Sequence, residues 1–169
     1  NKVESFGNIT DTSEKNSIEF SNVSFSYDSG ELLKNILLKI HQGEIIGLVG
    51  ASGSAKTTLI KLLSRQLDPC SGEIYVNGHN IKNYSYKGYT DIVSVASQQP
   101  FVFSCSLREN LLMVKPNATE AEMWHALEKT RIIGYVKSLK DGLDTVINES
   151  LNLSGGQLQR IALARLFLK

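Results

Sequence analysis

The chain has 169 residues, enough for one sizeable hydrophobic core with a smaller helical lobe, and its formal net charge is only +1 at pH 7. Lysine and arginine are scattered along the sequence, which argues against nucleic acid as a partner. No apolar run reaches the roughly 18–20 residues that span a bilayer. If the protein acts at a membrane, we therefore expect it to do so from the aqueous side.

The chain is predicted to begin with a polar arm followed by two strands. Residues 1–17 are polar and have neither helical nor strand periodicity, which is typical of a linker. Residues 18–27 alternate between apolar and polar side chains with one slip, and residues 32–40 form a second strand-like run before a turn at 41–44. We therefore expect an antiparallel pair at the start of the ordered region.

The next segments are typical of an α/β core. Residues 44–49 are almost wholly apolar and predict a central parallel strand, and residues 57–66 have the apolar spacing of a helix. A hairpin is expected around the turn Asn77-Gly78, since this dipeptide favours a tight two-residue connection. Residues 91–97 then predict another buried strand.

Beyond Pro100 the sequence becomes helical until about residue 150. Thr119 and Glu122 have the spacing of a capping box, and the amphipathic run 122–139 follows them. This region is interpreted as a helical insertion between parts of the α/β core. Several side chains that could bind metals stand alone, without ligand-like spacing, and we do not expect them to be ligands: His41, Cys70, His79, Cys105 and His125.

The strongest motif is a glycine-rich segment between the apolar strand and the helix, GLVGASGSAKTTLIKLL at residues 47–63. Such a loop directs backbone amides at phosphate oxygens, and the following helix contributes its dipole. A lysine then supplies a charge for the outer phosphates, and the hydroxyl after it binds magnesium. The alternative, an ordinary Gly/Ser turn before a helix, does not explain why a strand, a helix and a Lys-Thr pair occur together. The nine residues predicted to surround the phosphates are Gly50, Ala51, Ser52, Gly53, Ser54, Ala55, Lys56, Thr57 and Thr58.

Ala55 stands where a second glycine is expected. Because Ala55 lies at the entry of the helix, we expect a negative φ there, which alanine tolerates; a positive φ would cost about 1–2 kcal/mol. We expect the loop still to bind nucleotide; if the Ala55 methyl group crowds the β-phosphate, Ala55→Gly should raise nucleotide affinity.

A second motif, LNLSGGQLQRIALARLFL, lies near the end of the sequence. A serine hydroxyl and bare glycine amides at a helix start form an anion site, although alone they are equally typical of a serine cap with a flexible turn. The residues predicted to contact phosphate here are Ser154, Gly155, Gly156 and Gln157, and those predicted to line one side of the helix are Leu158, Ile161, Ala162 and Leu166.

From about residue 18 onward the sequence resembles the ATP-binding cassette of ABC transporters. Residues 50–58 resemble the Walker A loop, residues 153–157 reproduce the LSGGQ signature, Gln98 matches the Q-loop glutamine, and Tyr27 falls where an aromatic ring stacks on adenine. The resemblance implies an α/β fold of the P-loop NTPase class, with an antiparallel β subdomain, a parallel-sheet core and an inserted helical subdomain. The implied segments are a linker at 1–17, a nucleotide-binding core at 18–104, a helical subdomain at 105–152, and the signature with its helix at 153–169.

The resemblance also implies roles for individual residues. The cofactors would be ATP and Mg²⁺, with Lys56 and Gln98 as catalytic residues and Thr57 and Gln98 at the metal. The partners would be a second nucleotide-binding domain in a head-to-tail dimer and a transmembrane domain, fused N-terminally. The protein would then act at the cytoplasmic face of the cell (inner) membrane.

Two segments are similar to the exporter subtype. The residues QQPFVFSCSLRENLL match the exporter Q-loop region, in which Phe101 and Phe103 would lie near the transmembrane coupling helices. The residues before the signature resemble the exporter x-loop, but Asn148 and Leu151 replace common glycines, and Glu149 is expected to keep the acidic position.

The sequence contains no run of four apolar residues followed by Asp-Glu, which is the Walker B pattern of the family. We therefore expect a fragment of the cassette, lacking the C-terminal part of the core, which binds ATP but does not hydrolyse it. One alternative is a regulatory or degenerate nucleotide-binding module without turnover. Another, an ABC ATPase of the DNA-repair type, is disfavoured because no long heptad run separates Gln98 from Ser154.

Overall fold

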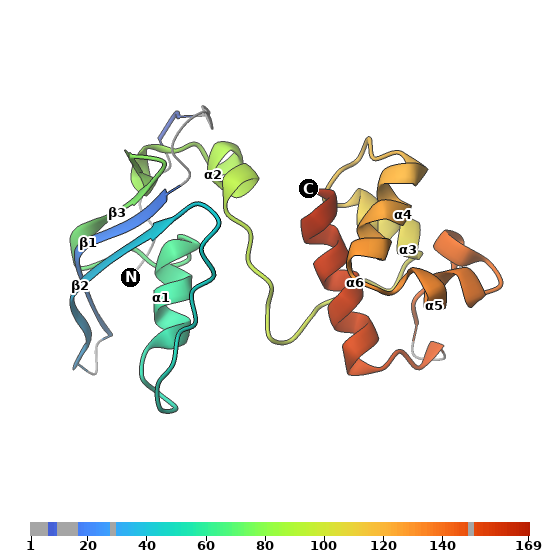
Figure 1. The fold of residues 1–169 in the computed structure, drawn as a ribbon, viewed down its shortest axis with the longest axis horizontal. Coiled ribbons are helices and arrows are strands. Elements are labelled where there is room, and N and C mark those ends of the chain that lie inside the picture. Colours follow the sequence, from blue (N-terminus) through green and yellow to red (C-terminus); the bar gives the residue numbers. More distant parts are fainter. Residues whose placement is uncertain (1–6, 10–16, 28–29, 149–150) are drawn as a thin grey trace. The chain divides into compact units, whose positions relative to one another are not determined.

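The computed structural model describes residues 7–9, 17–27, 30–148 and 151–169, which fall into two compact units, Asn1–Ser94 and Val95–Lys169 (Figure 1). Its longest helix has 14 residues, and none of the described helices is long and apolar enough to cross a bilayer. The elements of the first unit are β1 (Ser17–Tyr27), β2 (Gly30–His41), α1 (Lys56–Leu63), β3 (Ser71–Val76), β4 (His79–Asn80), the short 3-10 helix η1 (Ile81–Asn83) and α2 (Tyr86–Ile92). Those of the second unit are α3 (Leu107–Leu112), α4 (Glu120–Lys129), α5 (Ile133–Ser138), the 3-10 helix η2 (Gly142–Asp144) and α6 (Gly155–Leu168).

The sheet of the first unit is antiparallel, in the order β2-β1-β3-β4. The predicted pair of strands is confirmed, and so is the hairpin, whose turn residues Asn77 and Gly78 have φ values of 53° and 78°. The slip in the alternation of β1 coincides with a register shift between Phe20 and Val23, where Asn22 has a φ of 51°. Because of this irregularity, Phe20 and Val23 are both buried although they are three residues apart.

Two segments predicted as buried strands, the first of them parallel, are not strands. Residues 44–49 pair with no strand among the described residues, and Ile45 and Val49 are 99% and 97% exposed. Residues 91–92 end α2, and residues 93–97 continue without strand pairing. A parallel strand depends on hydrogen bonds to neighbouring strands on its edges, and the described residues place none beside either segment.

The second unit is a small helical bundle around one apolar cluster. Figure 1 shows α6 running beside α4, and both helices contribute buried side chains to this cluster, including Ile161 and Ala164 from α6. The predicted capping box of Thr119 and Glu122 is confirmed at the start of α4, and α3 begins with a second one formed by Ser106 and Glu109. Each box satisfies amides that a helix start otherwise leaves unpaired.

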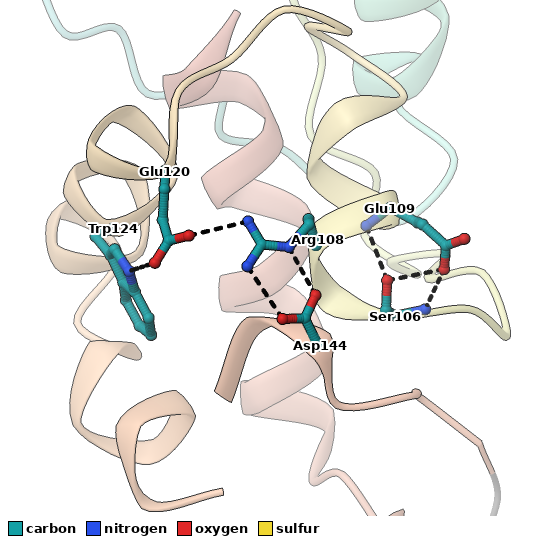
Figure 2. Close-up of polar contacts among 6 residues, drawn as sticks. All are labelled: Ser106, Arg108, Glu109, Glu120, Trp124 and Asp144. Atoms are coloured by element: carbon teal, nitrogen blue, oxygen red, sulfur yellow. Dashed lines mark hydrogen bonds and ion pairs between the residues drawn. The ribbon is translucent and has the colours of Figure 1, made fainter. Parts of the chain in front are cut away.

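A polar network ties three elements of this bundle together (Figure 2). Arg108 of α3 donates from Nε and Nη2 to the two carboxylate oxygens of Asp144 at 2.6 and 3.1 Å, and from Nη1 to Glu120 of α4 at 3.2 Å. Glu120 also accepts from the indole of Trp124 at 3.1 Å. The hydrogen bond from Arg108 lowers the pKa of Asp144, so this carboxylate stays charged in the folded unit.

Candidate functional site

The glycine-rich loop before α1 is organised around the ammonium group of Lys56. Its Nζ donates to the carbonyl oxygens of Gly50 and Ala51 at 2.7 and 2.6 Å, and to the hydroxyl of Ser54 at 3.0 Å. The amide of Ser54 also donates to the carbonyl of Ala51 at 3.2 Å, which closes a turn within the loop. The loop therefore folds around a positive charge, as a site for an anion requires.

The two glycines of this loop are needed for different reasons. A side chain at Gly50 would begin 2.5 Å from the Ser54 hydroxyl and 3.9 Å from Lys56 Nζ, so it would intrude on the polar centre of the loop. Gly53 has a φ of 82°, a left-handed conformation that favours glycine, and the space around it is open.

Ala55 differs from the prediction. Its φ is +62° and its ψ is 11°, so the N-cap residue of α1 is left-handed, whereas a negative φ was expected. Its side chain is 8% exposed and belongs to the apolar cluster of the first unit, together with Leu62 and Phe20. The methyl group thus packs against the core, which explains why alanine is accommodated despite a strain of about 1–2 kcal/mol.

The start of α1 offers further anion-binding groups. The first helical amides have no intrahelical acceptor, and the positive end of the helix dipole lies at the same place. Thr57 is exposed, whereas Thr58 is buried. Lys56, the loop and the helix start together match the arrangement that binds phosphate groups in other proteins.

Tyr27 is the last residue of β1 and lies in the same unit as the loop. Its ring is 43% exposed, and Phe25 contacts it edge-on, with centroids 4.9 Å apart and planes at 87°. Phe25 therefore fixes one edge of the tyrosine while part of the ring remains open to solvent. Its role as an adenine platform stays a prediction.

The signature residues lie at the start of α6, in the second unit. The Ser154 hydroxyl accepts from the Gln157 amide at 3.2 Å, and the Gln157 side chain accepts from the Ser154 amide at 2.8 Å. Gly155 has nothing within 4 Å of the position that a side chain would take, so its backbone can be approached closely. Within this unit alone, Ser154 acts as a helix cap, and contact with phosphate stays a prediction.

The apolar side of α6 was predicted in part. Ile161 is fully buried as expected, but Ala164 and Leu168 are the other buried side chains, while Ala162 and Leu166 are only partly covered. The predicted apolar side is therefore rotated relative to the buried side of the helix by about one residue position.

Gln98 is exposed in a bend of the second unit, so its predicted pairing with Thr57 at magnesium stays a prediction.

Glu149 lies outside the described residues. Asn148 and Leu151 stand where glycines were expected, and the amide of Leu151 donates to the side chain of Asn148 at 3.2 Å. The polar side chains that were missed include Asn110, which is buried, and Arg165, which is half-buried; only their position within apolar helices could have drawn attention to them.

Comparison with known proteins identifies the family. The family described as ABC transporter matches residues 33–169. The putative multidrug export ATP-binding/permease protein YgaD of Bacillus subtilis is 39% identical over 155 residues, covering 90% of this chain and 27% of that protein. ABC transporter B family member 1 of Arabidopsis thaliana is 38% identical over 156 residues, covering 90% of this chain and 12% of that protein.

A solved structure agrees with these matches. The structure of a bacterial Atm1-family ABC exporter with ATP bound has a TM-score of 0.85 and 29% identity to this chain, covering 98% of it and 29% of that exporter. The chain thus spans less than a third of the length of these relatives. It belongs to the ABC transporter family, and its α/β fold is that of the ATP-binding cassettes in exporters of this family.

Proposed function

We propose that this chain binds the phosphate groups of ATP through the loop 50–58, as the nucleotide-binding part of an exporter. The observation that carries the proposal is the position of Lys56 Nζ, within 3.0 Å of two loop carbonyls and the Ser54 hydroxyl. On binding, the ammonium group exchanges these neutral acceptors for charged phosphate oxygens. A hydrogen bond between charged groups is stronger than one to a neutral carbonyl, so the exchange favours the bound state.

The residues present fit a magnesium ion that is held largely by the nucleotide. The described residues contain no group of three or more His, Cys, Asp or Glu side chains that could hold a metal by themselves. Mg²⁺ prefers oxygen ligands and is commonly bound through few protein groups together with phosphates. We assign the hydroxyl of Thr57, which is exposed at the helix start, and the side chain of Gln98 as its protein ligands. When bound, the ion neutralises charge on the phosphate oxygens.

The remaining site residues have separate roles in the proposal. Tyr27 stacks on adenine, and the loop amides from Gly50 to Thr58 surround the phosphates. Ser154, Gly155, Gly156 and Gln157 of a second cassette, arranged head to tail, close over the outermost phosphate. Gln98 and the helical unit then transmit closure to a transmembrane domain, fused N-terminally, at the cytoplasmic face of the cell (inner) membrane. Support for this assembly comes from the relatives, which include export ATP-binding/permease proteins.

Residues 1–169 lack the apolar run with Asp-Glu, and we propose that this chain by itself binds ATP without hydrolysing it. Phosphoryl transfer requires an oriented nucleophile as well as charge neutralisation, and the sequence offers no carboxylate in the expected context. Phosphate release from Mg-ATP that clearly exceeds the release by Lys56→Ala would contradict this part.

The test is calorimetric titration of the chain with Mg-ATP. Lys56→Ala should weaken binding by roughly 10- to 100-fold, because it removes charge-assisted contacts worth about 1.5–3 kcal/mol. Lys61→Ala is the matched control, since Lys61 is an exposed lysine in the last turn of the same helix. Equal weakening by both substitutions, or no binding by the parent chain, would refute the assignment. If the chain binds ATP but no ATP is hydrolysed even when the chain is part of a full-length transporter, the alternative of a regulatory or degenerate nucleotide-binding module would be favoured instead.

A further inference from the structure

The segment 101–106, which leads into α3, carries an exposed aromatic pair on a firmly held backbone. The rings of Phe101 and Phe103 meet edge to face, with centroids 4.8 Å apart and planes at 89°, and they are 68% and 41% exposed. An exposed aromatic pair is an unusual feature in a loop, where side chains are ordinarily mobile and polar.

The backbone of this segment is fastened first by α3 and by residues 145–147. Asn110 is fully buried, and its side chain accepts from the amide of Phe103 at 2.9 Å and donates to the carbonyl of Phe103 at 2.9 Å. On the other side, Ile147 donates to the carbonyl of Cys105 at 2.9 Å. These contacts hold residues 103–105 but leave Phe101 unsupported.

The support for Phe101 comes from α6. Arg165 donates from Nη2 to the carbonyl of Phe101, and its guanidinium group lies over the ring of Phe103, 5.8 Å from the centroid. Its Nε is buried and has no hydrogen-bond partner within the described part of the chain. A buried donor without a partner costs free energy, which the contacts of Arg165 with Phe101 and Phe103 must offset. Burial also lowers the pKa of Arg165.

We propose that Arg165 is a positioning residue that fastens the aromatic segment 101–103 to the signature helix α6, so that the two move as one body. Ser154 begins this helix and Arg165 follows eleven residues later, a span of about 16 Å along the axis. If the signature contacts nucleotide, as the proposed function holds, any displacement of α6 is carried directly to Phe101 and Phe103. The fastening itself is testable without nucleotide.

Cys105 provides a reporter within the same segment. The chain has two cysteines, Cys70 and Cys105, so Cys70→Ser leaves Cys105 as its one thiol. Burial raises the pKa of the Cys105 thiol, and the charge of Arg165 acts in the opposite direction. Its reaction with 5,5′-dithiobis(2-nitrobenzoate), followed as a function of pH, reports both the access to the segment and the pKa of the thiol.

The decisive variant is Arg165→Met in the Cys70→Ser background. If Arg165 fastens the segment, its loss frees residues 101–103 and uncovers the neighbouring thiol of Cys105, whose backbone stays bonded to Ile147. The reaction then becomes at least about tenfold faster, and the apparent pKa of the thiol falls toward its ordinary value. If the segment stays in place, loss of the positive charge alone raises this pKa and slows the reaction. The two possibilities therefore have opposite signs.

Arg160→Met is the matched control, because Arg160 lies on the same helix and also donates to a carbonyl, that of Arg131 at 3.1 Å. This variant should leave the rate and the pKa of Cys105 unchanged. A slower reaction in Arg165→Met, or an equal acceleration in Arg160→Met, would overturn the proposal. A failure of Mg-ATP to bind would leave these rates as they are, so the two proposals fail independently.

Discussion

Replacing Ala55 by glycine should separate strain in the backbone from crowding of the nucleotide. Ala55 is left-handed, with a φ of +62°, and its side chain is 8% exposed among apolar residues of the core. Both properties are present in the chain without nucleotide. The strain therefore acts on the stability of the fold, and the affinity for ATP should depend little on it.

The magnitude follows from three contributions. Glycine relieves a left-handed strain of about 1–2 kcal/mol, whereas loss of the buried methyl group removes about 0.8 kcal/mol of apolar burial and the added freedom of the unfolded chain costs about 0.4–1 kcal/mol. Ala55→Gly should thus leave the stability of the chain within about 1 kcal/mol of the parent, which corresponds to a change in Tm of no more than about 4 °C for a chain of this size. The Kd for Mg-ATP should change by less than about threefold.

The assays are thermal unfolding followed by circular dichroism and calorimetric titration with Mg-ATP. Ala51→Gly is the control, because Ala51 lies in the same loop, is exposed and has no positive φ. It should not stabilise the chain, since glycine there adds only conformational freedom to the unfolded state. A fall in Tm of more than about 4 °C for Ala55→Gly would refute the strain argument. A tenfold gain in affinity would show that the methyl group crowds the phosphates after all.

Substitutions at three further positions, Tyr27, Glu122 and Asn110, give additional tests. Tyr27→Ala should weaken Mg-ATP binding severalfold while Tyr27→Phe hardly changes it, because stacking needs the ring and not the hydroxyl; equal effects in titrations would exclude the adenine role. Glu122 has its pKa lowered to about 2 by hydrogen bonds from Lys115 and Thr119, so its contribution to stability is present above the unfolded pKa of about 4.3 and is lost as pH falls toward 2. Glu122→Gln keeps the capping geometry but loses the charge, so its Tm should lie below that of the parent at pH 7 and approach it near pH 2; a constant difference would contradict the assignment. Asn110→Ala should destabilise the chain by about 1–3 kcal/mol in urea unfolding, since it removes the buried side chain that accepts from the amide of Phe103 and donates to its carbonyl, and a neutral result would contradict the proposed anchoring.

Local signals in the sequence were sufficient for much of the fold. The turn Asn77-Gly78 and the capping pair Thr119 and Glu122 specify conformations through their own backbone and side-chain chemistry, so they could be predicted without knowledge of their surroundings. The residues of the proposed phosphate loop were also chosen from spacing alone, because the role proposed for them depends on neighbours in the chain; that role stays a prediction.

Features that depend on distant residues could not be predicted in this way. The apolar run 44–49 is compatible with a strand, but pairing depends on neighbours that the run itself does not specify. N-cap residues ordinarily have extended dihedrals, so a left-handed Ala55 was not expected, although the glycine that the motif favours at this position is a local sign of a positive φ. Arg165 contacts Phe101, which lies 64 residues earlier in the chain, and no periodic pattern in the sequence indicates such a contact.

The central claim is that Lys56 recognises the phosphate chain of ATP, and the most direct measurement is the affinity of the parent chain and of Lys56→Ala for Mg-ATP and for AMP. The parent should prefer Mg-ATP by at least tenfold, because AMP lacks the outer phosphates that the ammonium group would contact. In Lys56→Ala this preference should largely disappear while AMP affinity stays within about threefold. If Lys56→Ala keeps the full preference for Mg-ATP over AMP, then Lys56 does not recognise the outer phosphates, despite its place at the centre of the loop.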